Sequence, residues 1–87
     1  MKIITLNLNG IRAASRKDFF PWLKEQNADY ICLQELKAQE TDLSLEMKSP
    51  YEYKGYFSFA IKKGYSGVGF IQNINHLRLQ SIWAFLN

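Results

Sequence analysis

Two asparagines and a glutamate stand where two apolar segments of the chain end. Asn7 and Asn9 close the apolar run that begins at Lys2, and Glu35 follows the apolar run of residues 30–34. Mg²⁺ prefers oxygen ligands and typically takes one or two carboxylates, several waters and substrate phosphates. A partly buried, unpaired carboxylate is costly, so a cation is its natural partner. These residue types indicate a metal and phosphate site, although turn-forming asparagines and a solvated glutamate would give the same spacing.

The elements that must position these side chains can be predicted from the patterning. Residues 2–8 are rich in β-branched side chains and show no helical period, so they predict a strand buried on both faces. An aromatic amphipathic run follows and predicts a helix capped by Asp18 that ends near Gln26, because this cap places Pro21 in the first turn. Residues 30–34 predict a second strand.

A strand, a helix and a second strand in this order form a βαβ unit. Its right-handed crossover makes the two strands parallel, so their C-terminal ends meet at one edge of the sheet. Open α/β folds bind ligands at such an edge. We therefore expect Asn7, Asn9 and Glu35 to lie close together there.

The remaining chain predicts a short helix and a hairpin, which makes the fold class α/β. In order, we expect a cap at Thr41 or Asp42, a helix over residues 43–47, a strand over residues 53–60, a loop over residues 62–66 and a paired strand opening at residues 67–69.

Length and composition limit the class of protein. With 87 residues, 47% of them hydrophobic, the chain can form one small domain that buries roughly 60% of its unfolded surface. A single cysteine excludes an internal disulfide, and Cys32 lies in an apolar run where a small buried core residue is expected. No stretch reaches secretory or membrane-spanning length, so we expect a cytoplasmic protein.

The net charge of +3 is small, but the basic residues cluster. Such short clusters could contact phosphates, although they are more often simply solvated. A non-catalytic nucleic-acid-binding module is therefore an alternative function; its contacts would be Arg12, Lys17, Lys62, Lys63 and Tyr65.

Two further residues could do chemistry. Lys37 could pair with Glu35 or with a phosphate, or could be an ordinary exposed lysine. His76 is the only histidine and lies in a C-terminal segment of different character, so we expect no catalytic role for it.

Three motifs carry a family resemblance. N-L-N-G-I-R-A, L-Q-E-L-K and K-K-G-Y-S-G-V-G occur in this order within residues 1–69. They resemble the opening portion of the exonuclease III class of apurinic/apyrimidinic endonucleases, in the endonuclease/exonuclease/phosphatase superfamily. The resemblance implies an incomplete four-layered α/β sandwich, Mg²⁺ or Mn²⁺ as cofactor and a monomer acting on double-stranded DNA. The implied reactions are hydrolysis 5′ to abasic sites and 3′ to 5′ exonuclease activity.

The resemblance also implies roles for individual residues. Glu35 would be a metal ligand, Asn7 would support the metal and the scissile phosphate, and Asn9 would lie next to the metal; Asn7 and Glu35 would thus be catalytic. Lys37 would help to hold the acidic centre. The implied DNA contacts are Arg12, Ala13, Lys17, Lys37, Gly64 and Tyr65. The family's later catalytic Tyr, Asp, Asn and His residues cannot be placed in this sequence, so catalysis by this chain alone is not expected.

The composition changes after residue 69. Residues 70–87 contain no Lys, Asp, Glu, Gly or Pro. We expect residues 1–69 to be the N-terminal part of the family's domain and residues 70–87 to be an out-of-frame tail, because a shifted reading of plausible codons gives a family-like Tyr-Ser-Lys-His-Lys-Pro. A selected amphipathic helix is the competing interpretation, and an unselected tail would promote aggregation. A missing second sheet should leave Phe57, Phe59 and Val68 poorly covered.

Overall fold

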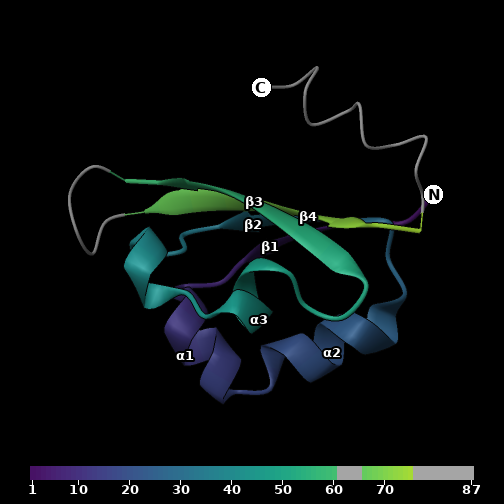
Figure 1. The fold of residues 1–87 in the computed structure, drawn as a ribbon, viewed down its shortest axis with the longest axis horizontal. Coiled ribbons are helices and arrows are strands. Elements are labelled where there is room, and N and C mark those ends of the chain that lie inside the picture. The colour runs from purple at the N-terminus through teal and green to yellow at the C-terminus, as the bar shows by residue number, and fades with distance from the viewer. Residues whose placement is uncertain (61–65, 76–87) are drawn as a thin grey trace.

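The computed structural model describes residues 1–60 and 66–75 (Figure 1). Four strands form one sheet in the order β1-β2-β4-β3, and the helices lie on one face of it (Figure 1). This arrangement confirms the α/β class. The elements are β1 (Ile3–Asn7), α1 (Ile11–Arg16), α2 (Phe19–Gln26), β2 (Tyr30–Gln34), the 3-10 turn η1 (Glu40–Asp42), α3 (Leu45–Lys48), β3 (Tyr53–Phe59) and β4 (Gly67–Asn73).

The strand pairing agrees with the sequence. β1 and β2 are parallel, in a register that runs from Ile3 opposite Tyr30 to Asn7 opposite Gln34. β3 and β4 are antiparallel neighbours, which confirms the predicted hairpin, and β4 also pairs antiparallel with β2. β4 continues past residue 69 to Asn73, so the first residues of the expected tail lie within the sheet. The division at residue 69 stays a prediction.

The prediction that the first strand is buried on both faces is wrong. Along β1, exposed side chains alternate with half-buried ones, and Ile3 is 57% exposed. β1 lies at the edge of the sheet, and the helices cover only one of the two sheet faces (Figure 1). A strand in this place is covered on one side only.

Helix α2 begins as the sequence predicts, after Asp18 and with Pro21 in its first turn. Asp18 has a φ of 64°, and its side chain makes no capping hydrogen bond. Helix α1 was not predicted. It is short, it follows Gly10, whose φ of 103° favours glycine, and it buries Ile11 completely.

The expected helix over residues 43–47 is wrong in both its bounds and its cap. Asp42 accepts a hydrogen bond from the Gln39 N–H at 2.9 Å and so closes the turn η1 instead. Leu43 is extended and buried in the core. Helix α3 starts two residues later, where the Ser44 hydroxyl accepts a hydrogen bond from the Met47 N–H at 3.2 Å.

The core lies between the sheet and the helices. Phe57 and Phe59 are half-buried and pack against it, so the expectation that both are poorly covered is wrong. The Phe57 ring fills the space over Gly69, where an added Cβ would lie 2.8 Å from it. Val68 is 52% exposed, as expected, and Cys32 is half-buried rather than buried. Within the described residues no helix has the length and apolar character to cross a membrane.

Candidate active site

The site begins where the parallel strands β1 and β2 end. The Leu8 N–H donates to the Gln34 carbonyl at 3.0 Å, and the Gly10 N–H donates to the Glu35 carbonyl at 2.9 Å. The two chain segments therefore stay side by side for several residues beyond the strands. This pairing brings the segment of Asn7 and Asn9 against the segment of Glu35.

Four side chains meet at this edge. Asn7 Nδ2 donates a short hydrogen bond to Glu35 Oε2, while Asn7 Oδ1 accepts the Asn9 N–H at 2.9 Å. Lys37 Nζ donates to Asn9 Oδ1 at 2.6 Å and lies 3.6 Å from Glu35 Oε1. The structure thus brings together Asn7, Asn9 and Glu35 and adds Lys37 to them. We call these four residues the polar ring.

Left-handed backbone at three positions shapes the polar ring. Asn9, Glu35 and Lys37 have φ values of 50°, 55° and 51°. Non-glycine residues in this region cost on the order of 1–3 kcal/mol each and persist where surrounding structure holds them. Leu36 is completely buried between Glu35 and Lys37 and supplies that anchor.

The charged members of the polar ring remain open to solvent. The Glu35 side chain is 39% exposed and the Lys37 side chain 41% exposed. Ion pairs in such surroundings contribute only about 0–1 kcal/mol to stability. Both groups can therefore exchange partners at little cost when a ligand enters.

The side-chain oxygen atoms of the polar ring suit a hard divalent cation as ligands. The Glu35 carboxylate and the amide oxygens of Asn7 and Asn9 are all oxygen ligands, as Mg²⁺ requires. In residues 1–60 and 66–75, no group of three or more His, Cys, Asp or Glu side chains is placed to hold a metal. One carboxylate with neighbouring amides fits an ion that fills its remaining positions with water and phosphate.

Arg12 ties helix α1 to the loop that carries Lys37. Arg12 Nη2 donates to the Lys37 carbonyl at 3.2 Å, and Arg12 Nη1 lies 3.7 Å from Asp42 Oδ1. The Arg12 side chain is still 46% exposed, so it can also reach a ligand. The role of Asp42 was missed because its sequence neighbourhood pointed to a helix cap.

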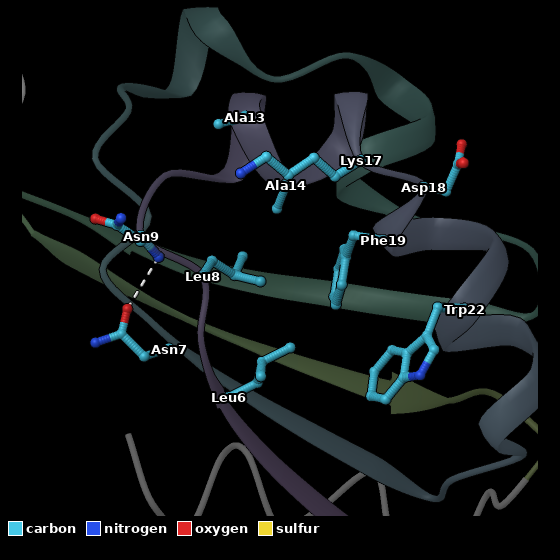
Figure 2. A pocket seen from close by; sticks show the side chains of 10 residues that line it. All are labelled: Leu6, Asn7, Leu8, Asn9, Ala13, Ala14, Lys17, Asp18, Phe19 and Trp22. Carbon is cyan, nitrogen blue, oxygen red and sulfur yellow. Dashed lines mark hydrogen bonds between the residues drawn. The ribbon is translucent and has the colours of Figure 1, made fainter.

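A cavity of 380 Å³ adjoins the polar ring, between β1 and helices α1 and α2 (Figure 2). Asn7 and Asn9 lie at one end of it and Trp22 lies at the other (Figure 2). Trp22 is 39% exposed. The aromatic run to which it belongs predicts a helix with an aromatic face and gives no sign of this cavity. The other lining residues are Leu6, Leu8, Ala13, Ala14, Lys17, Asp18 and Phe19.

The expected DNA contacts fall into two groups. Ala13 and Lys17 line the cavity, and Arg12 and Lys37 are bonded at the polar ring. Gly64 and Tyr65 lie outside the described residues, as do Lys62, Lys63 and His76. The DNA contacts expected of these residues other than His76 stay predictions, and so does the expectation that His76 has no catalytic role.

A family profile and individual related sequences match this chain and agree with each other. The sequence profile of the Endonuclease/Exonuclease/phosphatase family matches residues 4–74. An exodeoxyribonuclease of Bacillus subtilis is 52% identical over 68 residues, which are 77% of this chain and 26% of that protein. The DNA-(apurinic or apyrimidinic site) endonuclease 2 of Schizosaccharomyces pombe is 40% identical over 80% of this chain and 15% of its own length.

Solved structures agree with the sequence comparison. The catalytic domain of Xenopus laevis APE2 superposes with a TM-score of 0.67 and 43% identity, over 84% of this chain and 23% of that one. An AP endonuclease from Archaeoglobus fulgidus gives a TM-score of 0.71 and 33% identity, over 83% and 27%. The chain therefore spans about a quarter or less of the length of these relatives.

Proposed function

We propose that this chain, which belongs to the endonuclease/exonuclease/phosphatase family, carries the first part of the active site of a DNA repair nuclease of the exonuclease III type. The observation that carries this proposal is the convergence of Asn7, Asn9, Glu35 and Lys37 at one sheet edge. The similar exodeoxyribonuclease and AP endonucleases support the same conclusion.

The proposed substrate is double-stranded DNA, cleaved at the phosphodiester 5′ to an abasic site or at a 3′ end. Mg²⁺ or Mn²⁺ held by Glu35, Asn7 and Asn9 would polarise the scissile phosphate and stabilise the leaving oxygen. Asn7 also keeps the Glu35 carboxylate in place through its amide N–H. Arg12, with its half-exposed guanidinium, can donate hydrogen bonds to backbone phosphates.

We further propose that this chain does not cleave DNA by itself. In the described part of the chain, Glu35 is the single acidic side chain of the polar ring, and no second acid or histidine stands beside it to activate water. General acid–base catalysis typically contributes a factor of roughly 10²–10⁴. Binding of the substrate by this chain does not need that group.

Two measurements on the whole 87-residue chain test the function. The first is binding to an abasic duplex and to an intact duplex of the same sequence, with Mg²⁺ and with EDTA. We expect Mg²⁺ to strengthen binding to the abasic duplex, and Glu35→Gln to remove that effect. Equal, metal-independent binding to both duplexes would favour the non-catalytic binding module instead.

The second measurement is nicking of the abasic duplex at high protein concentration. We expect no Glu35-dependent nicking above background. Nicking that requires Mg²⁺ and Glu35 would support the nuclease and refute the proposed inactivity.

The proposed frame change after residue 69 is tested separately by the gene sequence, which should continue into the family's later motifs in the shifted frame.

A further inference from the structure

We propose that the Lys37 ammonium is an internal competitor for the divalent cation: it holds the oxygens of the metal site while the metal is absent and turns toward a DNA phosphate when the metal binds. This inference rests on the proposed metal site at the polar ring. It goes further, because it gives one side chain two successive partners and predicts opposite effects on metal and on DNA.

The Lys37 ammonium group lies where the proposed cation would bind. Lys37 Nζ lies 2.6 Å from Asn9 Oδ1 and 3.6 Å from Glu35 Oε1, two of the oxygens that the cation would use. Mg²⁺ binds oxygen at about 2.1 Å, so an ion on Asn9 Oδ1 would lie within about 4.7 Å of Nζ. A divalent and a monovalent cation this close repel each other, even in water.

The Lys37 side chain can turn away from the polar ring without any movement of the backbone. The Lys37 carbonyl accepts a hydrogen bond from the Arg12 guanidinium at 3.2 Å, and the neighbouring Leu36 is completely buried, so the backbone is held in place. The side chain, by contrast, is 41% exposed, and its flexible four-carbon stem can rotate into solvent. Release therefore changes only side-chain torsions and leaves Glu35 in place.

Once released, the Lys37 ammonium group needs a new anionic partner. Asp42, a carboxylate near the Lys37 loop, already pairs with Arg12 at 3.7 Å and is therefore a poor alternative partner for the released ammonium. A phosphate that shares the bound metal would bring a new negative charge beside Lys37. Metal binding and phosphate contact by Lys37 should then support each other.

The test uses Mn²⁺ alone as the probe, titrated into the 87-residue chain and followed by the electron paramagnetic resonance signal of the free ion. Lys37→Gln should tighten Mn²⁺ binding roughly 3- to 10-fold at low salt, because it removes the competing charge. Lys37→Arg should leave Mn²⁺ affinity within about 2-fold of wild type. With Mn²⁺ saturating, Lys37→Gln should weaken binding to an abasic duplex several-fold.

The matched control is Lys24→Gln, which removes the same charge from helix α2. Lys24 lies over the Tyr51 ring, 5.0 Å from its centroid, and does not belong to the polar ring. It should leave Mn²⁺ affinity unchanged. A comparable gain in Lys24→Gln would mean that net charge alone is responsible and would overturn the proposal.

Glu35→Gln separates failure of this inference from failure of the proposed function. If Glu35→Gln binds Mn²⁺ as well as wild type, the polar ring is not the metal site and both proposals fail. If Glu35→Gln loses Mn²⁺ but Lys37→Gln binds it no more tightly than wild type, the metal site stands and the competition is refuted. A gain in Mn²⁺ affinity without loss of DNA binding would refute the transfer of Lys37 to phosphate.

Discussion

Replacing Asn7 by aspartate should make the stability of this protein depend more strongly on a divalent metal. The Asn7 amide has two partners, since Oδ1 accepts the Asn9 N–H at 2.9 Å and Nδ2 donates to Glu35. Aspartate keeps the shape and the acceptor but places a second carboxylate oxygen against Glu35. Without metal, the Asn7→Asp variant should therefore be less stable than wild type.

The structure sets the size of this effect. A hydrogen bond to a charged group contributes about 1.5–3 kcal/mol. Glu35 is 39% exposed and Lys37 lies 3.6 Å from it, so solvent and the ammonium reduce the loss to about 1–2 kcal/mol. For a domain of this size, each kcal/mol lowers the melting temperature by roughly 4–8 °C.

A bound divalent cation should reverse the loss. With two carboxylates the site attracts the cation more strongly, and a ligand at 100 times its Kd stabilises the folded state by about 2.7 kcal/mol. Thermal melts followed by circular dichroism, in EDTA and in excess MgCl₂, measure both effects. The rise in melting temperature with Mg²⁺ should be larger in Asn7→Asp than in wild type.

A second substitution serves as the internal control. In the double variant Asn7→Asp, Glu35→Gln, an amide again faces a carboxylate, so the metal-free stability should recover. Asn75→Asp makes the same exchange beside Glu52, where Asn75 Nδ2 now donates to Oε2 at 2.8 Å, and it measures the general cost of such a pair. A melting temperature of Asn7→Asp that matches wild type in EDTA, or that does not respond to Mg²⁺, would refute the reasoning.

Three further predictions concern the core and the sheet. The buried Tyr53 hydroxyl donates to the Ala28 carbonyl at 2.9 Å, so Tyr53→Phe should cost about 1–3 kcal/mol in urea unfolding. Burial raises the pKa of Tyr53 above its usual 10.0. The stabilising contribution of the protonated Tyr53 side chain is therefore complete below pH 10.0 and is lost as the pH rises through the raised pKa. Tyr53→Phe should not show this loss of stability at high pH. Gly69→Ala should destabilise by about 1–3 kcal/mol, because its Cβ would lie 2.8 Å from the Phe57 ring; an unchanged urea midpoint would contradict this packing. Burial also raises the pKa of the Cys32 thiol, so alkylation near neutral pH should be slower in the folded chain than in urea, and equal rates would count against the half-buried position.

The edge of the sheet that holds the site could be predicted because few topologies fit the pattern. Two apolar runs joined by a helix require a parallel pair, and a parallel pair places Asn7 and Glu35 at one edge. The turn that sets α2 after Asp18 was predictable for a local reason, namely the position of Pro21. These features depend on residues that are close in sequence or on rules of chain crossing.

The features that could not be predicted depend on contacts between distant segments. The exposure of β1 follows from its place at the sheet edge, which no local pattern gives. The pairing of Arg12 with Asp42 joins residues from different elements, and either residue alone suggests a solvated charge or a cap. The left-handed backbone of Lys37 is rare for such a residue and has no sequence signal, yet it helps to place the ammonium in the polar ring.

Leu36 links the formation of the site to the formation of the whole sheet. Its N–H donates to the Gly67 carbonyl at 3.1 Å, its carbonyl accepts the Ile11 N–H at 2.9 Å, and its side chain is completely buried. The loop that carries Glu35 and Lys37 is therefore held by the start of β4 on one side and by the start of α1 on the other. A metal affinity measured on this chain would then depend on its folding as well as on the chemistry of the proposed ligands. For this reason the informative variants change the half-exposed side chains of Glu35 and Lys37 and leave Leu36 intact.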